Sequence, residues 1–264
     1  MQPTEPIESN NNCKENETDK ELENLVKNYE ILREDYPNYD LLFKIIVIGN
    51  SGVGKSCLSM KATRNSFDTN YLATVGFEFF VFNIKFDSRI IKLQIWDTCG
   101  QEIYRSLITS FYKNSSLALI VYAIDDEKSF NDIDLWIKDL RTNSSPDIKI
   151  FLIGNKADLE ANRKISKEQA LQIKRDFDFN LFMETSAKTG FNAQELFIEA
   201  SKVLYIDYIK HQQQKPKKRG ELIKDKNLNK KKGNNCFSFN LEISSSFLLN
   251  SIKSLLFDVK NGSF

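Results

Sequence analysis

The chain has 264 residues, a formal net charge of +1 and 28% charged residues. This near-neutral balance argues against nucleic acid as a partner, because domains that bind nucleic acid carry an excess of Lys and Arg. Four scattered cysteines without C-x-x-C spacing suit a reducing compartment better than a disulfide framework. From the polar N-terminus and the lack of a run of about eighteen apolar residues, we expect neither a signal peptide nor a membrane-spanning helix.

Residues 1–40 are predicted to form an extension before the main domain. As far as Glu17 the extension is rich in Glu and Asn and poor in apolar residues, which predicts disorder. Thr18-Asp19-Lys20-Glu21 then has the pattern of a capping box, and apolar residues follow at helical spacing up to Leu32. The prediction is one amphipathic helix that ends at Pro37. Packing on the domain's own surface and binding to a partner both remain open for this helix.

The first strong motif follows the apolar run at 41–48, which predicts a buried strand. It is Gly49-Asn50-Ser51-Gly52-Val53-Gly54-Lys55-Ser56, a G-x-x-x-x-G-K-[ST] sequence followed by a helical pattern. Glycines allow backbone N–H groups to turn inward around a phosphate. Lys55 can reach the terminal phosphates, and the Ser56 hydroxyl can bind Mg²⁺. The motif therefore predicts a nucleotide-binding loop, with an ordinary glycine-rich turn as the alternative.

A second motif follows two segments, 77–86 and 89–96, whose close spacing predicts a β-hairpin. It reads Asp97-Thr98-Cys99-Gly100-Gln101-Glu102. An acid at the carboxyl end of a strand facing a phosphate loop is placed to bind Mg²⁺. The Gly100 N–H could approach a terminal phosphate, and Gln101 could orient an attacking water.

The third and fourth motifs follow later strands. Apolar runs at 117–124 and 148–153 predict buried strands, and 129–141 between them predicts an amphipathic helix in which Trp136 belongs to the core. After the second run comes Asn155-Lys156-Ala157-Asp158. The Asp158 carboxylate could accept two hydrogen bonds from guanine, whereas adenine would leave it opposed to an acceptor and unpaired.

A short last strand is predicted at 181–184, before Thr185-Ser186-Ala187-Lys188, whose N–H groups could meet the base carbonyl. A helix from about Asn192 to Ile209 would close the domain. Strands that alternate with helices predict an α/β fold with a mostly parallel sheet.

These four motifs in this order resemble the Ras superfamily of small GTPases over roughly residues 41–210, and most of all its Rab branch. The residues that carry the resemblance are Thr74-Val75-Gly76-Phe77-Glu78-Phe79, Lys92-Leu93-Gln94-Ile95-Trp96-Asp97-Thr98, Tyr104-Arg105-Ser106-Leu107 and Thr185-Ser186-Ala187-Lys188. The resemblance implies a Ras-like P-loop GTPase fold: a six-stranded sheet, mostly parallel with one antiparallel strand, flanked by five helices. It also implies a molecular switch that binds GTP or GDP with Mg²⁺, hydrolyses GTP slowly and acts in vesicle and membrane traffic.

The resemblance assigns roles to individual positions. Phe67 would stack on the guanine, and Thr74 in switch I would bind Mg²⁺ and sense the γ-phosphate. Gln101, Lys55 and Thr74 would be catalytic, and Ser56, Thr74 and Asp97 would hold the metal. The nucleotide would be bound by Gly49, Ser51, Gly52, Val53, Gly54, Lys55, Ser56, Cys57, Phe67, Thr74, Gly100, Asn155, Lys156, Asp158, Ser186, Ala187 and Lys188.

Implied partners are an exchange factor, a GTPase-activating protein and effectors that bind switch I and switch II. The effector surface would be an apolar patch of Phe79, Trp96 and either Phe111 or Tyr112. Cys99 stands where the family usually has alanine, so a GTP-binding interaction module with little hydrolysis is an alternative function. An ATP-using kinase or ATPase is disfavoured by the motif at 155–158, and the single histidine, His211, gives little support to zinc chemistry.

Residues 211–264 are predicted to form a basic, largely disordered tail with helical spacing near its end. Between Lys210 and Lys232 there are ten lysines or arginines against two acids. The chain ends Asn261-Gly262-Ser263-Phe264, without the prenylation box usual in the family. One hypothesis is that the tail makes peripheral contact with endomembranes from the cytoplasm; a solvated linker, a tail that binds a partner and an altered terminal exon are the alternatives.

Overall fold

A computed structural model describes residues 20–68, 74, 77–87, 89–99 and 111–214. The chain divides into two units, Met1–Gln214 and Lys215–Phe264, and every described residue belongs to the first. The predictions made for residues 1–19, for Gly100 and Gln101 and for the tail beyond 214 lie outside the described residues. Among the described residues, no helix is both long and apolar enough to cross a bilayer.

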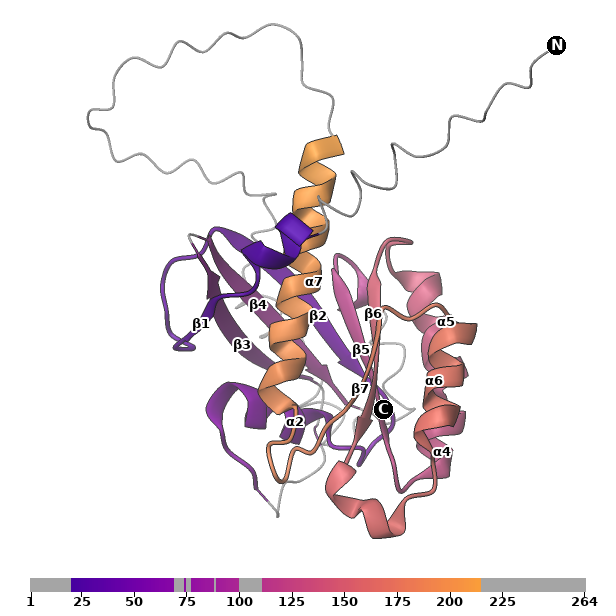
Figure 1. The fold of residues 1–264 in the computed structure, drawn as a ribbon. Helices are drawn as coiled ribbons and strands as arrows, with labels where there is room; N and C mark the ends of the chain where they lie inside the picture. The colour runs from indigo at the N-terminus through magenta and orange to yellow at the C-terminus, as the bar shows by residue number, and fades with distance from the viewer. Residues whose placement is uncertain (1–19, 69–73, 75–76, 88, 100–110, 215–264) are drawn as a thin grey trace, which may run out of the picture. The chain divides into compact units, whose positions relative to one another are not determined.

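The centre of the fold is one seven-stranded sheet with the order β1-β3-β4-β2-β5-β6-β7 (Figure 1). β2, β4, β5, β6 and β7 run parallel to one another, and β3 is antiparallel to both of its neighbours, β1 and β4. The strands are β1 Tyr29–Leu32, β2 Leu41–Ile48, β3 Phe77–Phe86, β4 Arg89–Thr98, β5 Leu117–Ala123, β6 Lys149–Asn155 and β7 Leu181–Glu184. The predicted count of six strands was therefore one too low, although β3 is the single reversed strand.

The additional strand comes from the N-terminal extension. Residues 20–25 are helical, but the helix predicted to reach Pro37 stops there, and β1 pairs with residues 83–86 of β3. The Asn83 side chain donates to the carbonyl oxygens of Arg33 and Glu34, at 2.8 and 3.1 Å, and so fixes the end of β1. The open edge of β3 offers hydrogen bonds that a continued helix could not use, and this tertiary pairing overrides the helical spacing of the apolar residues.

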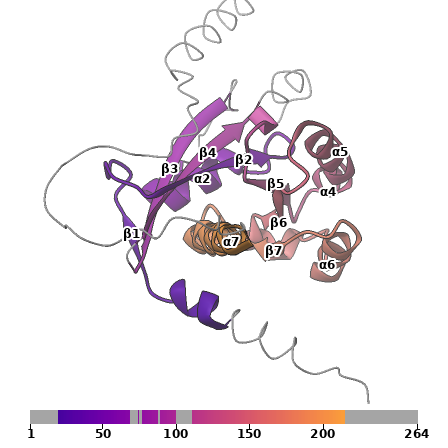
Figure 2. The ribbon, with the colours of Figure 1, turned by 90° about the horizontal axis from the view of Figure 1, so that it is seen from above.

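Helices cover both faces of the sheet, as Figure 2 shows with α7 viewed nearly end-on. They are α2 Lys55–Arg64, α4 Glu127–Asn131, α5 Ile133–Asn143, α6 Lys167–Asp176, α7 Ala193–Gln214 and the 3₁₀ helix η2 Ala157–Asn162. The helix predicted over 129–141 is divided into α4 and α5 at Asp132. The helices named here number six, where the resemblance implied five. α6 was not predicted, although Ser166 and Gln169 form a capping box at its start.

A main hydrophobic cluster includes residues of the sheet, α2 and α7. Alternate residues of β2, Ile45 and Val47, point into this cluster, and they are fully buried. Their neighbours Ile46 and Ile48 are also fully buried but lie outside the cluster, because successive side chains of a strand point to opposite faces. Both faces are thus covered, as expected for a mostly parallel sheet.

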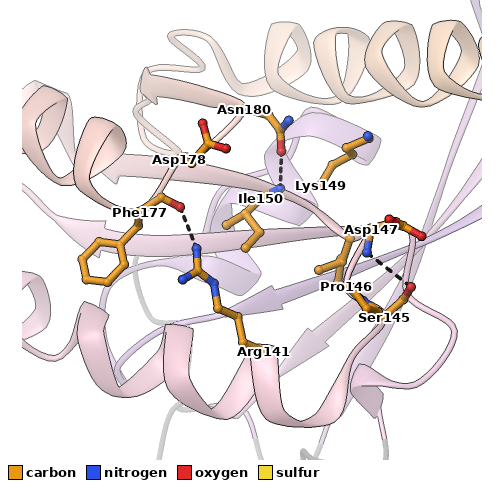
Figure 3. Close-up of a pocket in the computed structure, with 10 residues that line it drawn as sticks. Arg141, Ser145, Pro146, Asp147, Lys149, Ile150, Phe177, Asp178 and Asn180 are labelled. Atoms are coloured by element: carbon orange, nitrogen blue, oxygen red, sulfur yellow. Dashed lines mark hydrogen bonds between the residues drawn. The ribbon is translucent and has the colours of Figure 1, made fainter.

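A cavity of about 500 Å³ opens at the amino-terminal end of β6 (Figure 3). Its two cationic side chains are already engaged: Arg141 donates to the Phe177 carbonyl at 2.7 Å, and Lys149 lies 2.6 Å from Asp207. Ligands of parallel α/β sheets bind at the carboxyl ends of strands. The sequence motifs meet at that opposite edge, so the functional site has to be sought there.

Candidate functional site

The phosphate-loop motif connects β2 directly to α2. Gly49 has φ 139°, and a Cβ on it would lie 2.1 Å from the Val121 carbonyl oxygen. Gly54 has φ 93°, and a Cβ there would lie 2.4 Å from Asn155 Nδ2. At these two positions both the conformation and the space exclude a side chain. The loop is therefore packed closely against β5 and β6.

Lys55 is the first residue of α2, and it is only 5% exposed. Its ammonium donates to the carbonyl oxygens of Gly49 and Asn50, at 2.9 and 2.8 Å. Burial lowers the pKa of Lys55, while the nearby Asp97 carboxylate acts in the opposite direction. Because an ammonium group has three N–H donors, one remains for an anion beside the loop.

Ser56, Thr74 and Asp97 come together beside Lys55, although they belong to three separate segments. The Ser56 and Thr74 hydroxyl oxygens are 2.6 Å apart, and Ser56 donates to Asp97 Oδ2. Asp97 is fully buried, and its Oδ1 has no hydrogen-bond partner among the residues that the structure describes. Burial raises the pKa of Asp97 to about 7, despite opposing effects from Lys55 and Ser56. A buried, unpaired carboxylate oxygen beside two hydroxyls is a set of hard oxygen donors suited to a divalent cation.

Asn155, the last residue of β6, links two of the motifs. Its Nδ2 donates to the Val53 carbonyl oxygen in the phosphate loop at 2.8 Å. Its Oδ1 accepts from Thr185 Oγ1 at 3.1 Å and from the Ala187 N–H at 3.3 Å. One buried side-chain amide thereby joins the phosphate loop to the loop at 185–188.

Asp158 and the loop at 185–188 form the other end of the site. Asp158 Oδ1 accepts from Ser186 Oγ at 2.6 Å. Lys156 adopts a left-handed conformation, with φ 63°, and its ammonium lies 3.8 Å from Asp125. Ala187 is 5% exposed, and its neighbour Lys188 lies at the surface. The third and fourth sequence motifs therefore meet, as their positions at the carboxyl edge of the sheet predict.

Arg163 supports this end of the site and was missed by sequence reasoning. Its guanidinium donates to Glu184 at 2.7 and 3.0 Å and to Glu160 at 2.9 and 2.7 Å. Glu160 belongs to η2, just after Asp158, and Glu184 ends β7. The pair with Glu160 has local i,i+3 spacing, but no local pattern marks the pair with Glu184, because β7 is a separate element.

An aromatic group gathers around Trp96 of β4. Phe79 is 41% exposed, and its ring centroid is 5.4 Å from that of Trp96. The Phe111 ring is also 5.4 Å from Trp96. Phe111 is 8% exposed and Tyr112 is 1% exposed, so both are largely buried. Because the Phe111 ring contacts Trp96, we define the aromatic patch as Phe79, Trp96 and Phe111.

The other residues singled out from the sequence differ in their burial. Ser51 and Gly52 are exposed at the loop, whereas Val53 is fully buried and Cys57 is half-buried. Phe67 packs partly buried against the main core cluster, so its predicted contact with a base stays a prediction. Cys99 is 2% exposed. Gly100 and Gln101 lie outside the described residues.

Fold and site together define a P-loop nucleotide-binding protein: a glycine loop precedes a buried Lys and Ser, an acid ends β4, and an N-K-x-D motif ends β6. A sequence model of the Ras family matches residues 44–205. Ras-related protein Rab-13 of Canis lupus familiaris is 43% identical over 159 residues, which are 60% of this chain and 78% of that protein. Ras-related protein Rab-8B of Homo sapiens is 41% identical over 159 residues, covering 60% and 76% of the two chains. The chain therefore belongs to the Ras family, as a small GTPase of the Rab branch.

Proposed function

We propose that this chain is a molecular switch in vesicle and membrane traffic that binds GTP or GDP and hydrolyses GTP slowly. The observation that carries the proposal is the 2.8 Å hydrogen bond from Asn155 to Val53, since it joins the phosphate loop to the loops that would read the base. A nucleotide lying along this edge of the sheet would contact both ends of the site. The same edge is where parallel α/β sheets bind their ligands.

The residues beside the phosphate loop fit a Mg²⁺ ion. Ser56 and Thr74 would supply hydroxyl oxygens, and Asp97 would supply the carboxylate whose Oδ1 is buried and unpaired. When bound, the ion would neutralise phosphate charge. The Lys55 ammonium, held by two carbonyls, would place its remaining N–H on the same phosphates.

Hydrolysis would depend on the residues that surround the γ-phosphate. Gln101, which follows β4 in the sequence, would orient the attacking water, and Lys55 would stabilise the developing charge. Thr74 and Gly100 would bind the γ-phosphate and would lose this contact after hydrolysis. The two switch loops would therefore be ordered with GTP and less ordered with GDP. Intrinsic turnover would be slow, and an activating protein's arginine would raise it by about 10³–10⁵.

Guanine selectivity would come from Asp158. One of its oxygens is held by Ser186, which fixes the plane of the carboxylate. The carboxylate can accept from the ring N–H and the exocyclic amine of guanine, whereas adenine presents an acceptor there. The Ala187 N–H and its neighbours would meet the base carbonyl, and Phe67 would stack on the ring.

Effectors would bind the aromatic patch of Phe79, Trp96 and Phe111. Aromatic side chains at a surface supply large contact areas for protein partners. An exchange factor would act on the same switch segments to release the nucleotide. The basic stretch at 210–232 would add contact with anionic endomembranes, at about 1 kcal/mol per basic residue. The test of this contact is co-sedimentation with phosphatidylserine vesicles, in which the full chain is compared with residues 1–214.

The test of the proposed function is single-turnover hydrolysis of Mg²⁺·GTP by the purified full chain. We expect slow hydrolysis that falls at least about tenfold in Gln101→Leu and is unchanged in Gln172→Leu, an exposed control on α6. Tight GTP binding without turnover would favour the GTP-binding interaction module instead. Cys99, 2% exposed and close enough to Lys55 to influence its pKa, favours that alternative, and Cys99→Ala would then restore turnover.

A further inference from the structure

The side chain of Asn50, the second residue of the phosphate loop, is held by helix α5. Its Oδ1 accepts from the Trp136 indole N–H at 2.8 Å, and its Nδ2 donates to Asp132 Oδ2 at 2.6 Å. Asp132 is the N-cap of α5 and Trp136 lies one turn further along the same helix. Both ends of the amide therefore bind partners that are more than eighty residues away in sequence.

Asp132 and Trp136 each direct a polar side-chain group at Asn50. An Asp at an N-cap ordinarily accepts from the first N–H groups of its own helix. Asp132 has a helical conformation instead, with φ −79° and ψ −2°, because it also ends α4. Its side chain makes no capping bond within the described α5 and accepts from Asn50. Trp136 is 2% exposed, so its indole N–H needs a partner within the protein, and Asn50 provides it.

The main chain of the same residue holds the phosphate-binding lysine. The Asn50 carbonyl oxygen accepts from Lys55 Nζ at 2.8 Å, next to the bond from Lys55 to Gly49 at 2.9 Å. Any displacement of Asn50 moves one of the two acceptors that aim the ammonium. The second half of the loop is held separately, by Asn155 on the Val53 carbonyl. Two side-chain amides thus fix the two halves of the loop.

We propose that Asn50, Asp132 and Trp136 are positioning residues that set the place of Lys55 and thereby slow nucleotide release. The three residues act through Lys55 and need not touch the nucleotide themselves. The proposal rests on the proposed function, because it requires that the phosphate loop hold a guanine nucleotide. Its specific consequence is that the protein binds the nucleotide phosphates tightly only when one of the side chains at positions 50 and 132 can donate a hydrogen bond to the other.

The donor–acceptor logic permits a swap experiment. Asn50→Asp keeps an acceptor for Trp136, but it removes the donor to Asp132 and places two carboxylates against each other. Adding Asp132→Asn restores the match, since the amide introduced at 132 donates to the carboxylate introduced at 50. The double variant has the net charge of the wild type. Trp136→Phe removes the indole N–H together with part of the buried ring, so it also leaves space in the core.

The measurement is the release rate of a fluorescent GDP from the full chain in Mg²⁺ buffer, beside the melting temperature of each variant. We expect release to accelerate about tenfold in Asn50→Asp, which corresponds to about 1.4 kcal/mol, and several-fold in Trp136→Phe. The double variant should return to within about threefold of the wild-type rate. GMP lacks the phosphates that a P-loop lysine reaches, so it should compete equally well against wild type and Asn50→Asp.

Leu140→Ala is the matched control, because Leu140 is fully buried in α5 and takes no part in the contact with Asn50. It should lower the melting temperature while leaving GDP release unchanged. Release that follows the melting temperature in every variant, including Leu140→Ala, would show a merely structural role and overturn the proposal. An unrescued double variant would do the same. Wild-type protein that fails to bind fluorescent GDP would instead overturn the proposed function, and this inference with it.

Discussion

Arg163 donates to both carboxylate oxygens of Glu184, at 2.7 and 3.0 Å, and this paired contact joins the two base-side loops of the site. Glu184 immediately precedes the loop at 185–188, and Arg163 follows η2, which contains Asp158. The Glu184 side chain is 8% exposed, so its charge depends on this partner. Through Glu160 and Glu184, Arg163 therefore ties the segment of Asp158, the carboxylate proposed to read the base, to the loop at 185–188.

Arg163→Met is expected to weaken the base-side end of the site and the fold together. The free energy of unfolding should fall by about 2–3 kcal/mol, because a buried carboxylate loses its main partner, with Lys167 still 3.4 Å from Glu184. GDP release should accelerate about tenfold. Urea unfolding and fluorescent GDP release measure the two effects, with the exposed Arg175→Met as control. Release at the wild-type rate would show that Arg163 has no part in the site.

Asp158→Asn is expected to change the base preference from guanine to xanthine. The new amide oxygen can still accept from Ser186, which leaves the amide N–H₂ facing the base. Xanthine carries a carbonyl where guanine has its exocyclic amine, so the donor meets an acceptor. Affinity for GDP should fall about 100-fold or more while XDP gains. Competition assays against fluorescent nucleotide measure both, and Asp134→Asn, exposed on α5, should change neither.

The sequence was sufficient for the parts of the site whose chemistry is local. The phosphate loop, Asp97 at the end of β4 and the loop after β6 were each placed from a motif and its preceding strand. Arg163 and Asn50 could not be assigned in this way. Their roles come from partners in other elements, Glu184 and Asp132, and no residue spacing encodes such pairings.

The same reason explains the error in the N-terminal extension. Leu22 and Val26 have helical spacing and are 4% and 5% exposed, but the apolar pattern also continues through Tyr29 and Leu32, which lie in β1. When a short segment fits both a helical and a strand pattern, its secondary structure depends on the elements that it can pair with. Here pairing with the edge of β3 makes the segment a strand, and this pairing cannot be predicted from the sequence of the extension alone.

Leu22→Ala is expected to show that the extension is docked on the domain. Leu22 is 4% exposed and Leu25 is 40% exposed, although both belong to the helical residues 20–25. Leu22→Ala should lower the free energy of unfolding by about 2 kcal/mol, and Leu25→Ala should change it by less than about 0.5 kcal/mol. Urea unfolding of the two variants provides a matched comparison. Equal, small losses in both would contradict the docked position.

Lys44 gives a prediction that depends on pH. Its ammonium donates to the Phe111 and Lys113 carbonyl oxygens, at 2.7 and 3.0 Å, and lies 5.1 Å from the centre of the Trp96 ring. Burial lowers the pKa of Lys44 from 10.5 to about 8. Between these two pH values the unfolded chain holds a proton that the folded protein has released. The contribution of Lys44 to the free energy of unfolding must therefore rise with pH across this window.

Lys44→Met is expected to remove that rise, because methionine fills similar space without a titrating group. The difference between wild type and variant should be constant below pH 8 and should then grow in favour of the wild type up to about pH 10. Urea unfolding at several pH values measures this difference, and all other titrating groups cancel in it. Lys138→Met, at an exposed position on α5, provides the control with a flat difference. If the difference in free energy of unfolding for Lys44→Met were also independent of pH, the Lys44 ammonium would be solvated in solution. Lys44 would then not connect β2 to Trp96 and Phe111 of the aromatic patch.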